Sequence, residues 1–165
     1  MTDVYRVGHR WRLKGSTEQV YQHLSRPEAY PDWWPAIPSV DILQGDNEPQ
    51  VGDSVRMHVK SLLPYHIDWV MTTTSLDPPT FVETENTVVL GGRLRLVGPT
   101  SVHLRQDGDY TEVVQREVLS AEGWHLPGPL RLLAYAAFSF NHAYAAVGGR
   151  RGLQLLLDGA EVTTN

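Results

Sequence analysis

The sequence predicts an α+β domain in which a curved, seven-stranded antiparallel sheet is closed by one long C-terminal helix. Apolar and polar residues alternate along Val4–Lys14 and along several later segments, as they do in half-buried strands. Gly91-Gly92 and Asp107-Gly108 are typical hairpin turns between such segments. Residues 127–158 are instead rich in Leu and Ala, which favour a helix. We therefore expect a sheet layer and a helix layer that share one core.

The composition indicates one domain, residues 1–165, and argues against several classes of function. The net charge is −5 with acids and bases interspersed, whereas a nucleic-acid partner needs a basic patch. We expect no stable membrane insertion, because no apolar run reaches the roughly 18 residues of a spanning helix. The chain has no cysteine, which excludes disulfides and thiol chemistry. We expect a cytoplasmic monomer or homodimer, although a cysteine-free secreted protein also fits.

Two short helices are expected after the first strand. Ser16 and Gln19 have the spacing of a capping box, which starts the first helix. A second helical turn is expected over residues 28–34. Its two tryptophans, Trp33 and Trp34, cannot both face inward from one element. One of them, with Trp34 as the candidate, is therefore expected to line an opening.

Six more strands are expected before the long helix, over residues 40–43, 54–60, 65–74, 81–90, 93–105 and 110–120. Gly98-Pro99 interrupts the fifth of them, and proline inside a strand indicates a bulge. In the long helix, residues at three- and four-residue steps share one face. That inward face consists of Phe138, His142, Ala145, Gly149, Leu153 and Leu156.

Three segments resemble a known superfamily. They are STEQVYQHLSRPEAYPDWWP after the first strand, VGD at the start of the third, and NHAYAAVGGRRGL in the last helix. The chain resembles START-related, Bet v 1-like proteins of the helix-grip type, and in particular bacterial polyketide cyclase/dehydrase-like proteins labelled SRPBCC. The resemblance implies a cavity between sheet and helix that holds lipids, hormones, polyketides or aromatic compounds. It implies cyclisation or dehydration in some members, and it brings no universal catalytic motif.

The hairpin turns predict which side chains face that cavity. A turn at Gly91-Gly92 pairs Leu90 with Arg93, and a turn centred on Asp107-Gly108 pairs Val102 with Val113. By this register the concave face receives four polar side chains, Glu83, Glu85, Gln115 and Glu117. A bulge at Pro99 would move some of them to the other face.

The acidic side chains have two interpretations. In a poorly hydrated cavity, Glu117 and Glu83 could act as general acids or bases with His142. Alternatively, they lie solvated at the rim or pair with Arg150 or Arg151. His142 itself either contacts a ligand or is a core histidine bonded to a backbone carbonyl.

The remaining candidates are wall residues. Tyr65, Trp69 and Phe138 are expected to line the cavity, with core packing as the alternative. Asn141 lies about 100° from His142 on the helix and either reaches the ligand or anchors the helix. His9 is the only polar member of the inward set of the first strand, so it too is a site or packing residue.

These observations favour a protein that binds a small hydrophobic or aromatic molecule, of a lipid- or polyketide-like kind. The alternative is a polyketide cyclase, aromatase or dehydratase that uses the cavity carboxylates and histidine. A third interpretation is an interaction protein whose cavity is filled by side chains. No cofactor and no metal site are expected, because His58, His66 and His103 fall on the outer face and no metalloprotease or phosphate-loop motif is present.

Overall fold

The computed structural model describes residues 3–46, 48–62, 64–92, 94–122 and 127–159. One strand comes first, followed by short helices, six strands and a long helix, as the sequence predicts. The elements are β1 (Val4–Lys14), α1 (Thr17–Leu24), the 3-10 turn η1 (Pro27–Ala29), α2 (Tyr30–Trp33), β2 (Ser39–Gln44), β3 (Ser54–Val59), β4 (Ile67–Asp77), β5 (Phe81–Leu90), β6 (Leu94–Asp107), β7 (Tyr110–Glu122) and α3 (Gly128–Leu157).

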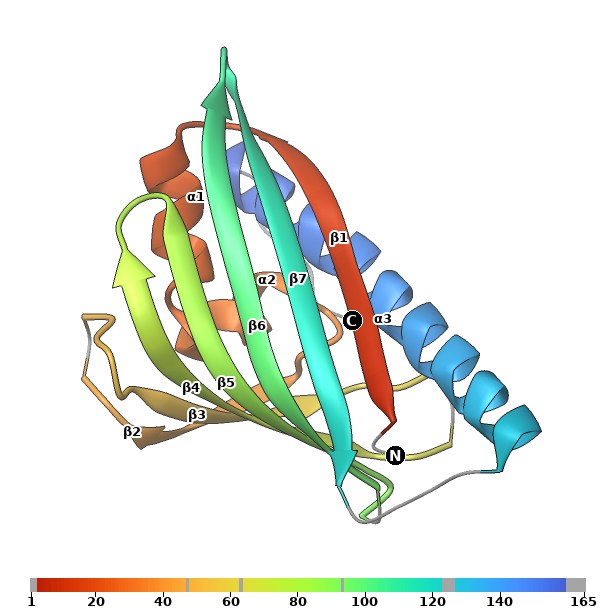
Figure 1. Ribbon diagram of the computed structural model, residues 1–165. Coiled ribbons are helices and arrows are strands. Elements are labelled where there is room, and N and C mark those ends of the chain that lie inside the picture. Colours follow the sequence, from red (N-terminus) through yellow and green to blue (C-terminus); the bar gives the residue numbers. More distant parts are fainter. Residues whose placement is uncertain (1–2, 47, 63, 93, 123–126, 160–165) are drawn as a thin grey trace.

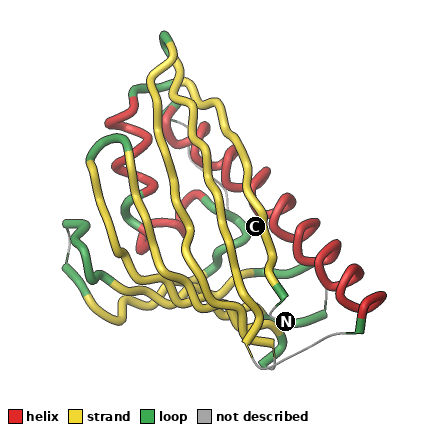
Figure 2. Tube along the Cα trace, in the orientation of Figure 1, coloured by secondary structure: helices red, strands yellow, loops and turns green. Residues whose placement is uncertain are grey.

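The seven strands form one antiparallel sheet in the order β1-β7-β6-β5-β4-β3-β2. The sheet is strongly curved (Figure 2), and α1 and α2 lie on its inner side (Figure 1). The long helix α3 runs beside the edge strand β1 and also contacts α1 and α2. Among the described residues, no helix is long and apolar enough to cross a membrane.

Close contact between α2 and α3 depends on glycine. The side chain of Trp33 is fully buried in the core, and its carbonyl group lies against Gly152 of α3. A Cβ atom at Gly152 would overlap the Trp33 carbonyl oxygen. Glycine costs about 1 kcal/mol relative to alanine in a helix, but here only glycine lets the two backbones approach.

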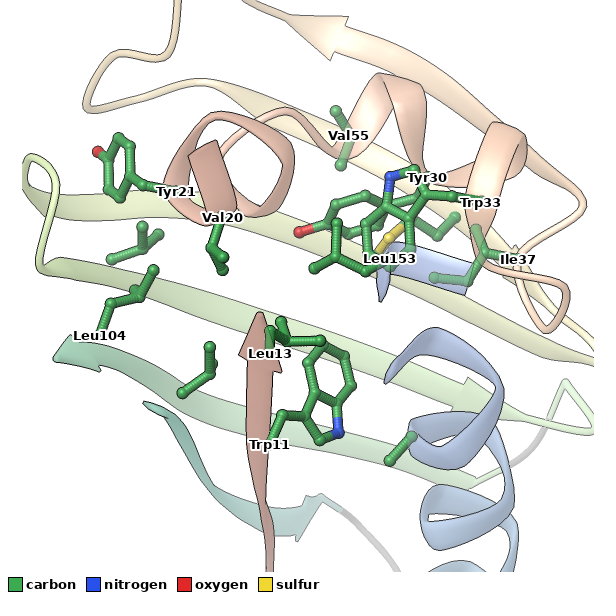
Figure 3. Packing of buried hydrophobic residues seen from close by; sticks show 14 residues of the cluster. Trp11, Leu13, Val20, Tyr21, Tyr30, Trp33, Ile37, Val55, Leu104 and Leu153 are labelled. Carbon is green, nitrogen blue, oxygen red and sulfur yellow. The ribbon is translucent and has the colours of Figure 1, made fainter. Parts of the chain in front are cut away.

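The buried apolar residues form two clusters. One joins β1 to α1, α2 and the end of α3, where Leu153 packs near Trp33 and Tyr30 (Figure 3). The other lies toward the start of α3 and includes Tyr5 and Phe138. The two clusters together hold α3 on the inner side of the sheet along most of its inward face.

The predicted register of β5 and β6 is wrong by one residue. Leu90 pairs with Leu94, because the turn is one residue longer than a two-residue hairpin, and Arg93 lies outside the described residues. The register of β6 with β5 and with β7 does not shift between the two sides of Gly98-Pro99. The predicted bulge there is therefore also wrong. A slip of one residue reverses the faces. Thr84 and Asn86 of β5 therefore face inward, and their neighbours in sequence face outward.

The observed β6–β7 register differs from the predicted one by two residues, so each side chain stays on its predicted face of the sheet. Val102 pairs with Gln115 rather than with Val113, because the turn residues are Gly108 and Asp109. Gln115 and Glu117 consequently face inward, as predicted.

Candidate functional site

A cavity of about 90 Å³ lies between the sheet and α3. Its walls are mainly apolar and include Trp11, Trp34, Ile37, Met57, Trp69, Met71, Val82, Val102, Val113 and Ala146. The polar side chains at its surface include His9, Thr84, Asn86, Thr100, Gln115 and His142. The volume is below the roughly 300–1,000 Å³ of drug-sized ligand sites. The cavity as it stands therefore suits a small molecule, and the flexible Met57 and Met71 could make room for a larger one.

Trp34 forms one wall of the cavity, whereas Trp33 belongs to the core. The indole Nε1 of Trp34 donates a hydrogen bond to the backbone oxygen of Ala145 at 2.8 Å. A Cβ atom at Gly149 would lie 2.6 Å from the Trp34 ring, so this glycine makes room for the indole. The ring also meets Trp11 edge-on, at 5.7 Å between centroids. These contacts fix Trp34 between β1 and α3.

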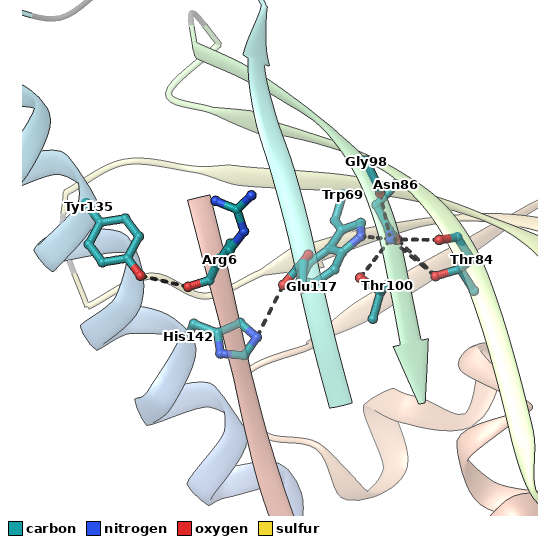
Figure 4. Close-up of polar contacts among 9 residues, drawn as sticks. All are labelled: Arg6, Trp69, Thr84, Asn86, Gly98, Thr100, Glu117, Tyr135 and His142. Carbon is teal, nitrogen blue, oxygen red and sulfur yellow. Dashed lines mark hydrogen bonds and ion pairs between the residues drawn. The ribbon is translucent and has the colours of Figure 1, made fainter. Parts of the chain in front are cut away.

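Asn86 holds a second wall through a dense set of hydrogen bonds (Figure 4). Its Oδ1 accepts from Nε1 of Trp69 at 2.8 Å. Its Nδ2 donates to Oγ1 of Thr100 at 2.9 Å and lies 3.2 to 3.3 Å from Thr84 and Gly98 acceptors. Asn86 is almost fully buried, and its amide is satisfied by the protein itself. Its contacts orient the Trp69 ring.

His9 brings an unsatisfied polar group to the cavity. It pairs across the sheet with Gln115, and its ring stacks on Trp11 at 4.6 Å. Both ring nitrogens are buried and lack a hydrogen-bond partner among the described residues. Burial, with a smaller contribution from the nearby His142, lowers the pKa of His9 to about 3. At neutral pH the ring is therefore uncharged, with one nitrogen able to donate and the other able to accept.

Glu117 and His142 form a buried pair beside the cavity. The Oε2 atom of Glu117 lies 3.3 Å from Nε2 of His142 (Figure 4). The Glu117 side chain is 0% exposed, and within the described residues neither carboxylate oxygen accepts a well-formed hydrogen bond. His142 lines the cavity, whereas Glu117 does not. The imidazole thus stands between the carboxylate and the cavity.

Known structures share this architecture, although no protein-family model and no curated protein sequence matches the chain. The ZhuI aromatase/cyclase from Streptomyces sp. R1128 superposes with a TM-score of 0.71 at 15% identity, over 94% of each chain. A START superfamily protein from Mycobacterium smegmatis gives 0.61 at 20% identity, over 92% of this chain and 99% of its own. Ara h 8.0201 gives 0.67 at 10% identity, over 95% and 99%.

The chain has the helix-grip fold of START and Bet v 1-like proteins. The fold prediction is therefore confirmed, including the long closing helix. In this helix-grip protein Phe138, Gly149 and Leu153 face inward, as predicted from their spacing.

Two predicted acidic site residues lie elsewhere. Glu83 and Glu85 alternate with the buried Thr84 and Asn86 and therefore face the outer side of the sheet. Glu83 is within reach of the Thr74 hydroxyl at 3.5 Å on that exposed side. Both assignments are wrong because the β5–β6 register was shifted by one residue.

Three other predicted residues lie outside the cavity surface. Asn141 anchors the helix, since its Oδ1 accepts from the backbone N of Leu62 at 3.0 Å. Phe138 packs edge-on against Tyr5 in the second cluster. Tyr65 precedes β4 and packs against the same cluster. The structure does bring together Trp34, Trp69, Gln115 and His142 at the cavity.

The sequence interpretation missed Asn86 and its threonine partners. The sequence pattern could have identified them, because residues alternate between the two faces of a strand. Asn86 lies on the same face of β5 as the apolar Val82 and Val88, and the charged residues of β5 lie on the other face. Within the described ranges, no three His, Cys, Asp or Glu side chains gather as a metal site requires.

Proposed function

We propose that the protein binds a small, uncharged hydrophobic or aromatic molecule in the cavity between the sheet and α3. The observation that carries this proposal is His9, whose two buried nitrogens lack partners in an otherwise apolar cavity. An unsatisfied buried polar group costs about 1–3 kcal/mol. A ligand hydroxyl or carbonyl that bonds to His9 would remove this cost. A carboxylate is disfavoured, because neutral His9 offers it no positive charge.

The cavity is smaller than a ligand of one or two rings requires, so binding such a ligand would need its walls to move. An apolar cavity of about 150 Å³ accommodates benzene. The cavity of about 90 Å³ would need only a modest movement of Met57 or Met71 to hold such a ring. Trp11, Trp34 and Trp69 would contact the ring, so binding should change tryptophan fluorescence.

The test compares 2-naphthol with naphthalene, which lacks the hydroxyl group. We expect both to quench tryptophan emission with one site per chain, and 2-naphthol to bind more tightly. His9→Phe keeps an aromatic ring but removes both nitrogens, so it should weaken 2-naphthol about 10-fold and leave naphthalene nearly unchanged. His103→Phe on the outer face is the matched control. If no small aromatic compound binds to the folded protein, the filled-core interaction protein is the better interpretation.

A second candidate function rests on the Glu117–His142 pair. Because Nε2 of His142 lies 3.3 Å from the buried carboxylate, Nδ1 is the nitrogen left to exchange a proton with a bound molecule. The helix-grip neighbours include an aromatase/cyclase, which suggests a polyketide-like substrate. In this proposal His142 moves the proton during a cyclisation or dehydration, and Glu117 holds and stabilises the imidazolium.

The assay for this candidate is the conversion of a short poly-β-ketone thioester mimic, followed by absorbance of the aromatic product. Glu117→Gln should lower kcat by at least about 100-fold, within the range for general acid–base groups. It should leave 2-naphthol affinity within about threefold of wild type, because Glu117 does not line the cavity. The control is Glu85→Gln on the outer face. Equal turnover in wild type and Glu117→Gln would exclude this role.

A further inference from the structure

The helix α3 has a second apolar face, which points away from the sheet. Its inward face is buried at Phe138 and Leu153. On the opposite side, Leu133 is 66% exposed, Phe140 64% and Tyr144 54%. Large apolar side chains gathered on one exposed surface mark an interaction site more often than chance. In Figure 1 the first turns of α3 stand apart from the strands.

The exposed face has the spacing of a coiled coil. Its residues are Leu130, Leu133, Ala137, Phe140, Tyr144 and Val147, which we call the outer seam. They follow one another at alternating steps of three and four residues, the a and d positions of a heptad repeat. Such a narrow seam fits one partner helix, whereas a solvated face of a helix has polar residues at these positions.

The charges on α3 argue against a membrane as the partner. The helix has no acidic residue, and its basic residues are Arg131, Arg150 and Arg151. Arg131 pairs with Asp3 at 3.2 Å. A helix that lies on an anionic membrane needs many Lys and Arg residues along its polar face, and here only the C-terminal arginines remain. The net charge of −5 would also be repelled by such a surface.

We propose that the outer seam pairs with the same seam of a second copy of this chain, in an antiparallel arrangement. If a two-fold axis passes between the two α3 helices at the level of residue 142, Phe140 lies opposite Tyr144 of the second copy. Ala137 then lies opposite Val147 of the second copy. Arg151, the next a position, then lies opposite Leu133 rather than opposite another arginine, as it would in a parallel pair. The five exposed seam side chains present on the order of 600 Å² per copy, against about 800 Å² per partner in a standard interface.

The first test is the mass of the protein in solution, by multi-angle light scattering from 1 to 100 μM. Wild type should approach twice the mass of one chain with rising concentration. Phe140→Glu should remain a monomer, and so should Leu133→Glu. Leu132→Glu is the control, because Leu132 is 71% exposed on the same helix but lies outside the seam. Circular dichroism checks that each variant is folded.

Orientation is tested by disulfide formation, for which the cysteine-free chain is well suited. A mixture of Ala137→Cys and Val147→Cys proteins should form the mixed disulfide, while Ala137→Cys alone should not cross-link. Ready cross-linking of Ala137→Cys to itself would instead show a parallel pair. A wild type that stays monomeric at 100 μM would overturn the proposal, as would a seam that acts only in binding anionic lipid vesicles or a different protein.

Discussion

Nε2 of His142 and Oε2 of Glu117 lie 3.3 Å apart, although one residue belongs to the closing helix and the other to the middle of β7. The carboxylate has no exposed atom surface, and His142 is the basic side chain beside it within the described part of the chain. Removing one member of a buried pair leaves the other without compensation, which costs about 3–5 kcal/mol. We therefore expect this pair to stabilise the position of α3 relative to β7.

A double-mutant cycle tests this coupling. Glu117→Gln and His142→Gln should each lower the free energy of unfolding by about 3 kcal/mol. The loss of unfolding free energy in the double variant should be at least about 1 kcal/mol smaller than the sum of the two single losses. The reason is that either substitution alone already removes the interaction between the two side chains. Urea unfolding at pH 7 gives the three differences. As a control, Glu122→Gln removes an exposed pair with Arg95 and should change stability by less than about 1 kcal/mol. Simple additivity would show that the two groups do not interact.

The fold could be predicted because its signals are local and repeated. Alternation along β1 and the Leu- and Ala-rich run of α3 each extend over many residues, so an error of one residue changes little. The face of a strand is different, because it depends on one turn length. The turn after Leu90 is a single residue longer than predicted, and this alone moved Glu83 and Glu85 to the wrong side.

Asn86 supplies the next prediction. Asn86→Ala should lower the free energy of unfolding by about 3 kcal/mol or more, because it removes several buried hydrogen bonds and leaves Nε1 of Trp69 without its acceptor. The loss should appear in chemical unfolding curves and as a change in Trp69 fluorescence. Glu85→Ala, one residue earlier on the outer face, should cost less than about 0.5 kcal/mol. A similar effect of both substitutions would contradict the role of Asn86 in the wall.

Two glycines of α3 should respond to alanine in opposite directions. At Gly148 a Cβ atom would meet only Cδ of Pro35, at 3.9 Å, so Gly148→Ala should stabilise the fold by about 0.5–1 kcal/mol. At Gly152 the same atom would overlap the Trp33 carbonyl, so Gly152→Ala should destabilise it by about 2 kcal/mol or more. The melting temperatures of the two variants, each compared with wild type, show whether each substitution stabilises or destabilises the fold. A gain in stability at Gly152 would disprove the close approach of α2 and α3.

The site was harder to predict than the fold, for a related reason. The local argument that adjacent tryptophans cannot share one interior direction predicts that Trp33 or Trp34 lines the opening, and only the structure shows that it is Trp34. The unsatisfied nitrogens of His9 and the pairing of His142 with Glu117 depend on how β1, β7 and α3 meet in space. The spacing of residues within any one of these segments does not predict such contacts between segments.

His9 makes stability depend on pH. Its pKa falls from 6.5 to about 3 on folding, chiefly through burial and secondarily through His142. Between these values the unfolded chain binds a proton at His9 and the folded protein does not, so stability decreases as the pH falls. Above pH 6.5 both states are neutral there, and His9 has no effect. The expected loss is at most about 1.4 kcal/mol per pH unit within this range.

His9→Gln, which cannot titrate, isolates this contribution. The difference in unfolding free energy between wild type and His9→Gln should be constant from pH 7 to 8. Below about pH 6.5 it should change steadily in favour of the variant, because only wild type loses stability through protonation of the unfolded chain. His103→Gln on the outer face provides the comparison for loss of an exposed histidine. A difference that stays constant down to pH 4 would mean that His9 takes up its proton in the folded state, and that its nitrogens are reached by solvent rather than held for a ligand.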